Sequence, residues 1–97
     1  MIQHIETTDI FRGAFFLCMG GELCGLEINE RQIASFRIRG EDMNGHDRAY
    51  QTGRALVNPV EYRMTLNQLR DILYKGLDDR RRKNERKRKN GLRHIHP

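Results

Sequence analysis

Residues 24–39, CGLEINERQIASFRIR, contain two short runs in which apolar and polar side chains alternate. Alternation with a period of two is typical of a strand that buries one face. The segment Asn29–Arg31 between the runs suits a turn. Because two strands alone are only marginally stable in water, we expect an antiparallel β-hairpin whose apolar face packs on helices. That apolar face would consist of Cys24, Leu26, Ile28, Ala34, Phe36 and Ile38.

The residues before the hairpin predict a helix over about 8–19. Thr7, Thr8 and Asp9 are good N-cap residues, and apolar side chains recur behind them at helical spacing. Gly20-Gly21 then provides a left-handed stop. Residues 1–6 have no strong pattern, and we assign no element to them.

Two helices are predicted after the hairpin. Residues 45–53 form a short one, with Asn44 as its N-cap and Gly53 as its end. Asn58-Pro59-Val60-Glu61 is the clearest helix start in the chain. The apolar stripe that follows at helical spacing is Tyr62, Leu66, Leu69, Ile72, Leu73 and Leu77.

Acid–base pairs four residues apart, such as Asp79 and Lys83, favour continuation of this last helix past Gly76. Asn90-Gly91 is its predicted end. The fold class is therefore a single α+β domain: an N-terminal helix, an antiparallel hairpin, a short helix and a long C-terminal helix with a basic extension. We expect residues 1–79 to form the domain and 80–97 to form a tail.

Charge is distributed unevenly between these two parts. Residues 80–97 carry nine Lys or Arg and one acid, a net +8, whereas residues 1–79 carry nine basic and twelve acidic side chains, a net −3. A basic block on a mildly acidic body is typical of a segment that binds polyanions.

Nucleic-acid phosphates are the polyanion that we favour, because neutralising them releases condensed counterions and gives affinity without base specificity. An acidic protein partner and a solvated, solubilising tail are the alternatives. The tail lacks the apolar face that membrane binding requires. The predicted contacts are Arg80, Arg81, Arg82, Lys83, Arg86, Lys87, Arg88, Lys89 and Arg93.

Arginines of the body could add to this surface. Arg37 and Arg39 share the outer face of the second strand, and a two-stranded ribbon can enter a DNA groove. The alternative is an ordinary solvent face whose charges prevent aggregation. Arg63 and Arg70 share one side of the long helix and could extend the basic surface, or simply solvate that helix; Arg54 is isolated.

The order of features resembles a family of small bacterial and phage proteins catalogued as a domain of unknown function. The resemblance rests on four stretches of residues 7–74: TTDIFRGAFFLCMGG, ELCGLEINERQIASFRI, AYQTGRALVNP and VEYRMTLNQLRDILY. It implies an α+β fold and a bacterial or phage origin, and it brings no activity and no catalytic residues. The basic tail lies outside it.

Other function classes find little support in the chain. No phosphate-cradling glycine loop and no nucleophile–base arrangement is present, so we expect a non-enzymatic protein without cofactors. His94 and His96 could chelate a metal only weakly, since zinc sites need three or four converging ligands. Small phage proteins that cover an acidic host surface provide the alternative function, a protein–protein interaction module. A homodimer, through paired hairpins or crossed helices, is compatible with either.

Compartment and redox state follow from composition. The longest apolar run, Ala14–Met19, is far shorter than the ~20 residues that a spanning helix needs. No basic region followed by a hydrophobic stretch marks a signal peptide, so we expect a cytoplasmic protein. Cys18 and Cys24 lack metal-site spacing and are expected to be reduced, small buried hydrophobes.

Overall fold

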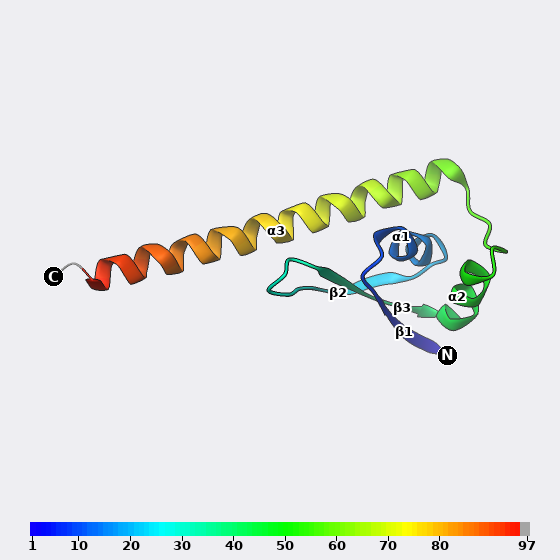
Figure 1. Ribbon diagram of the computed structural model, residues 1–97. Helices are drawn as coiled ribbons and strands as arrows, with labels where there is room; N and C mark the ends of the chain where they lie inside the picture. The colour runs from blue at the N-terminus through cyan, green and yellow to red at the C-terminus, as the bar shows by residue number, and fades with distance from the viewer. Residues whose placement is uncertain (96–97) are drawn as a thin grey trace.

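A computed structural model describes the backbone of residues 1–95 and the side chains of residues 1–85. It confirms an α+β fold with a long C-terminal helix (Figure 1). The elements in chain order are β1 (Ile2–Thr7), α1 (Ile10–Cys18), β2 (Glu22–Ile28), β3 (Ala34–Glu41), α2 (Met43–Gln51) and α3 (Pro59–Ile95).

The hairpin is part of a three-stranded antiparallel sheet in the order β1-β3-β2. We did not predict β1. It pairs with β3 over six residues, with Ile5 opposite Ile38 and Thr7 opposite Phe36. Because β1 occupies the second edge of β3, the chain itself provides the additional strand that a two-stranded hairpin needs.

The predicted alternation holds in β3 and is partly wrong in β2. In β3, Ala34, Phe36 and Ile38 are buried, while Arg37 and Arg39 are exposed. In β2 the register shifts between Leu23 and Gly25, which places an extra residue, Cys24, on the exposed side. The apolar side chains of β2 that pack on the core are therefore Leu23, Leu26 and Ile28.

The core lies between one face of the sheet and the helices. Phe16, Phe36, Ile38, Met43 and Leu69 are its largest fully buried side chains, and they come from α1, β3, α2 and α3. The sheet covers one side of α1, and α3 packs on α1 and contacts β2 at the hairpin (Figure 1). The other face of the sheet is not covered by any of the helices of the described part of the chain.

Local capping signals set most helix boundaries. Asp9 Oδ1 accepts the backbone N–H groups of Phe11 and Arg12 at 2.9 and 3.4 Å, and Asn58 Oδ1 accepts those of Val60 and Glu61 at 3.0 and 3.1 Å. The predicted cap of the short helix was wrong. The α2 helix begins at Met43, directly after Asp42 in the left-handed conformation (φ 52°).

The remaining observations on helix ends concern Asn44, the C-terminal end of α3, and the glycines that follow α1 and α2. The Asn44 backbone N–H is bound by the side chain of Gln3 at 2.9 Å, which ties α2 to β1. The α3 helix continues through Asn90-Gly91, the predicted terminator, as far as Ile95. Gly20 and Gly53 have positive φ values of 91° and 73° and follow α1 and α2 as expected.

Two glycines allow the start of β2 to lie against the end of β3. A Cβ atom at Gly21 would lie 2.7 Å from Ile38 Cγ2 and 2.8 Å from the carbonyl oxygen of Phe16. A Cβ atom at Gly40 would lie 2.9 Å from Met43 Cε and 3.1 Å from Gly21 Cα. Gly21 has no room for a side chain, because the Phe16 carbonyl and the branched Ile38 side chain fill the space, whereas at Gly40 the Met43 side chain would have to move.

We expect Gly21→Ala to lower the free energy of unfolding by about 1–3 kcal/mol, because the added methyl overpacks a tight contact. Gly25→Ala is the matched control within β2: there a Cβ would lie 3.4 Å from Arg37 Cβ, an ordinary contact. Urea denaturation of both variants measures the difference. Equal stability of the two would show that the contact at Gly21 is not tight.

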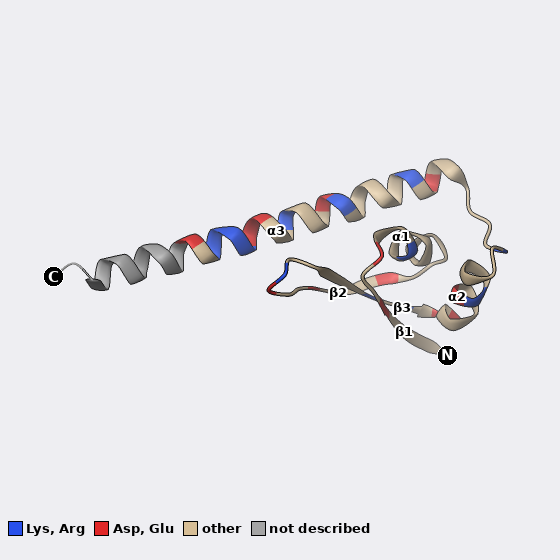
Figure 2. Ribbon diagram, viewed as in Figure 1, with Lys and Arg blue, Asp and Glu red and all other residues tan. Residues whose placement is uncertain are grey.

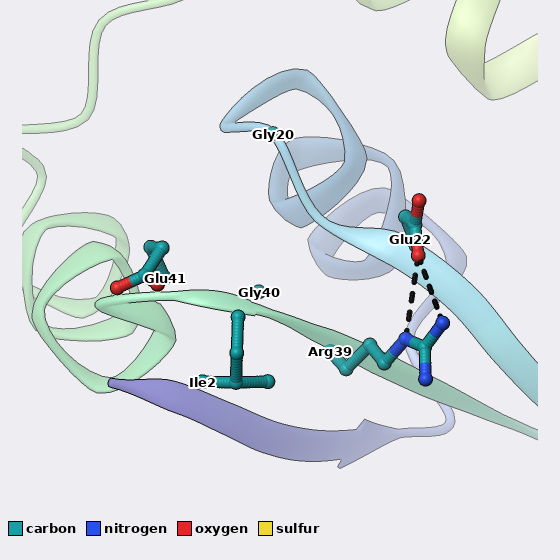
Figure 3. Close-up of a pocket in the computed structure, with 6 residues that line it drawn as sticks. All are labelled: Ile2, Gly20, Glu22, Arg39, Gly40 and Glu41. Atoms are coloured by element: carbon teal, nitrogen blue, oxygen red, sulfur yellow. Dashed lines mark hydrogen bonds and ion pairs between the residues drawn. The ribbon is translucent and has the colours of Figure 1, made fainter.

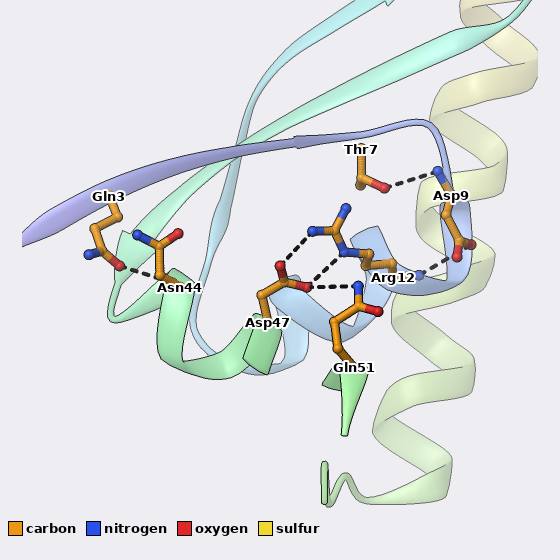
Figure 4. A network of polar contacts seen from close by, with 7 residues as sticks. All are labelled: Gln3, Thr7, Asp9, Arg12, Asn44, Asp47 and Gln51. Atoms are coloured by element: carbon orange, nitrogen blue, oxygen red, sulfur yellow. Dashed lines mark hydrogen bonds and ion pairs between the residues drawn. The ribbon is translucent and has the colours of Figure 1, made fainter. Parts of the chain in front are cut away.

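A bidentate ion pair joins α1 to α2. The Arg12 guanidinium donates from Nε to Asp47 Oδ1 at 2.8 Å and from Nη2 to Asp47 Oδ2 at 2.7 Å (Figure 4). Arg12 also lies over the Phe16 ring, 5.3 Å from its centroid. The hydrogen bond from Arg12 lowers the pKa of the Asp47 carboxyl and raises that of the guanidinium, while partial burial opposes both shifts. Paired side chains that are only about one-fifth exposed are screened less than surface pairs.

Removing this pair with Asp47→Asn should cost about 1–2 kcal/mol of unfolding free energy near neutral pH. Since the folded-state pKa of Asp47 is lowered, its contribution is present above the unfolded pKa of about 4 and is lost as pH falls through the folded value. The difference in thermal stability between the two proteins, measured between about pH 7 and 3, should therefore begin to shrink as the pH falls below about 4. A constant difference across this range would contradict the linkage.

Candidate nucleic-acid interface

The basic residues after position 79 whose side chains the structure describes occupy one turn of α3. Arg80, Arg81, Arg82 and Lys83 are consecutive helical residues, and Figure 2 shows them as the continuous basic stretch beyond the body. Consecutive helical residues differ by about 100°, so the four side chains point around the whole circumference. The side chains of Arg86, Lys87, Arg88, Lys89 and Arg93 lie outside the described residues.

Arg80 docks on the hairpin. Its guanidinium Nη1 donates a hydrogen bond to the carbonyl oxygen of Ile28, the last residue of β2. The side chain is half-buried, in a groove that Leu26, Ile28 and Lys83 also line. The expected division at Asp79 and Arg80 therefore falls inside a continuous helix, and Arg80 contacts the body.

Gly76 allows this close approach. A Cβ atom at this position would lie 3.1 Å from Leu26 Cδ2 and 3.2 Å from Ile28 Cδ1. The glycine lowers helix propensity by about 1 kcal/mol relative to alanine, yet the helix continues through it. Because Gly76 has no side chain, the hairpin can pack closely on α3 one turn before the basic residues.

The next three basic residues are open to solvent. The side chains of Arg81 and Arg82 are 73% and 69% exposed, and Lys83 is exposed as well. Asp78 contacts Arg81 at 3.5 Å and Arg82 at 3.3 Å. Such surface ion pairs contribute little and are screened by salt, so these cations stay accessible to a polyanion.

The structure does not bring Arg37 and Arg39 to the surface that carries the basic residues of α3. They lie on the face of the sheet opposite α1, because they alternate with buried Phe36 and Ile38. Arg39 contacts Glu22 at 3.2 Å, and Arg37 contacts Glu27 at 3.9 Å (Figure 3 shows the first pair). Exposed acids on these strands outnumber the two arginines: Glu6, Glu22, Glu27 and Glu41.

The other three arginines considered from the sequence lie in different parts of the structure. Arg54 is exposed in the loop after α2, whereas Arg63 and Arg70 lie on α3. Arg70 is half-buried, and its guanidinium carbon lies over the ring of Phe11 at 6.0 Å from the centroid. Phe11 lies on α1, and its side chain is 48% exposed.

The part of the chain that the structure describes holds neither a metal-binding cluster nor a helix suited to crossing a membrane. No group of three or more His, Cys, Asp or Glu among those residues could hold a metal ion. None of the helices described is both long and apolar enough to cross a membrane.

Burial raises the pKa of Tyr62, and its hydroxyl donates to the Phe11 carbonyl at 3.1 Å, which is a structural contact between α3 and α1.

Comparisons with known proteins found no matching protein family, no matching curated protein and no matching solved structure. The resemblance to small bacterial and phage proteins therefore stays a prediction.

We expect Arg80→Met to destabilise the protein more than Arg81→Met. Loss of the Arg80 hydrogen bond to Ile28 should cost about 1 kcal/mol, since a charged donor leaves a backbone carbonyl. Replacing Arg81, which is largely exposed, should change stability by less than about 0.5 kcal/mol. Denaturant unfolding compares the two, and equal losses would mean that Arg80 is not a docking residue.

Proposed function

We propose that this protein is a non-enzymatic nucleic-acid-binding accessory protein that contacts phosphates through the basic part of α3. The observation that carries the proposal is the placement of Arg81, Arg82 and Lys83. They are exposed on a helix whose preceding turns are packed on the body. Five more basic residues follow in the sequence, at positions 86–89 and 93.

Charge separation supports a polyanion as the ligand. The net +8 of residues 80–97 stands beside a body of net −3, so a phosphate chain is attracted to one end of the molecule. Basic side chains around the circumference of a helix can neutralise phosphates on either side of it. Such contacts release counterions and depend little on base sequence.

Docking of α3 supports a fixed direction of approach. Leu66 and Leu69 are buried, and Arg80 is bound to the hairpin carbonyl. The first turn of the basic segment is therefore held by the body, and less orientational freedom is lost on binding than for a free tail. An acidic protein surface is the alternative ligand, and the experiment below separates the two.

The test is fluorescence anisotropy of labelled oligonucleotides with the full chain over a salt series. If about five phosphates are neutralised, log Kd should depend on log salt concentration with a slope of magnitude about 4–5. The double variant Arg82→Gln/Lys83→Gln should reduce that magnitude by nearly 2 and weaken binding to all sequences alike.

The matched control is Arg48→Gln/Arg54→Gln, which removes the same charge from two exposed arginines outside α3. It should leave the salt slope unchanged. Salt-insensitive binding, or an equal effect of both double variants, would refute phosphate contact by α3. Absence of binding at low salt, with capture of an acidic protein that depends on Arg82 and Lys83, would establish the alternative instead.

A further inference from the structure

Two aromatic side chains on the surface lie on the same side of α3. Phe11 is 48% exposed and Tyr74 is 62% exposed, whereas the other five aromatic residues are buried or half-buried. Tyr74 is one helical turn beyond Arg70, and Arg70 lies over the Phe11 ring at 6.0 Å. Residues four apart on a helix are neighbours, so Arg70 and Tyr74 are adjacent on α3. Arg70 is thus next to Tyr74 along the helix and over Phe11 across it.

Arginines extend this side of the helix in both directions. Arg63, Arg70, Tyr74 and Arg81 are separated by seven, four and seven residues, which places them within about 40° of one another around the helix axis. They span about 27 Å along it. We call this side of α3, together with Phe11 from α1, the aromatic–arginine strip.

Packing explains why the strip stays open. The buried stripe of α3 contains Leu66 and Leu69, and Gly76 and Arg80 face the hairpin. Residues of the strip lie beside that stripe, where α1 contributes Phe11 and leaves the ring half-exposed. Phe11, with Arg70 over its ring, therefore keeps about half of its side chain open to solvent, and Tyr74 keeps more than half.

We propose that the aromatic–arginine strip binds single-stranded nucleic acid, with bases stacked on Phe11 and Tyr74 and phosphates neutralised by Arg63, Arg70 and Arg81. This inference rests on the proposed function and specifies its ligand. Alternating cations and exposed aromatic rings are the combination that holds unpaired strands without base specificity. Bases in a duplex are already stacked on each other and cannot reach a surface ring without unpairing.

The strip also connects to the basic segment. Arg81 belongs to both, so a strand that stacks on Tyr74 would continue onto the first basic turn of α3. Asp78 contacts Arg81 at 3.5 Å on the surface, and a phosphate would compete with that weak pair. One strand could then follow α3 from Arg63 toward the basic segment.

The experiment measures binding of labelled single-stranded and duplex oligonucleotides of about 12 nucleotides to the full chain, with DNA and RNA arms. Tyr74→Ala should weaken single-strand binding roughly 5- to 100-fold, as expected for loss of one stacked base, and change duplex binding less than about two-fold. Tyr74→Phe keeps the ring and should retain single-strand affinity. Phe11→Leu, which keeps apolar bulk, should weaken single-strand binding in the same direction.

The matched control is Met64→Ala, because Met64 is 57% exposed on α3 on a different side. It should leave both affinities unchanged. Equal binding of single strands and duplexes, unaffected by Tyr74→Ala, would overturn the strip while leaving phosphate binding by the basic segment intact. Loss of affinity in Tyr74→Phe would assign the effect to the hydroxyl and overturn stacking. Absence of binding to every oligonucleotide would overturn both proposals.

Discussion

Close packing of α3 on α1 and the hairpin determines where the basic residues of the proposed interface lie. Leu69 is fully buried, and a Cβ atom at Gly13 of α1 would lie 3.3 Å from its Cδ2. Gly76 of α3 likewise allows close contact with Leu26 and Ile28 of β2. The glycine on α1 brings that helix close to α3, and the glycine on α3 brings α3 close to the hairpin. These two contacts fix the direction of α3. The positions of the described basic residues and of Tyr74 then follow from the helical geometry of α3, while α1 positions Phe11.

Features with local causes were predictable from the sequence, and features with distant partners were not. Asp9 and Asn58 cap helices through their own neighbours, so their roles could be predicted from a few residues. The β1 strand has only Ile2 and Ile5 as apolar residues, and its partner is β3, whose paired residues lie 29 to 39 positions later in the chain. The bulge at Cys24 reflects register with Arg37 and Ile38, which no pattern within β2 indicates. The Asn44 prediction failed because α2 already begins at Met43, after Asp42 in the left-handed conformation, so Asn44 lies inside the helix. Its backbone N–H donates to Gln3, a residue 41 positions earlier.

The candidate site shows the same division. The basic block is a compositional feature and needs no structure to be recognised. Arg80, in contrast, binds the carbonyl of a residue 52 positions earlier, and Phe11 and Arg70 are also far apart in sequence. Arg37 and Arg39 looked like an open basic edge when read along one strand. Their acidic neighbours on β2 become visible only once β2 and β3 are paired.

The order of elements along the chain has a kinetic consequence. All three strands and α1 precede Gly53, yet Leu66 and Leu69, which help to close the core over α1, come later. During synthesis the apolar side of α1 therefore stays uncovered until α3 has been made. The contacts that complete the core join residues that are tens of positions apart. Non-local contacts of this kind slow folding and leave apolar surface open to chaperones or aggregation in the interval. The helix that carries the cations is thus also the element that completes the buried core.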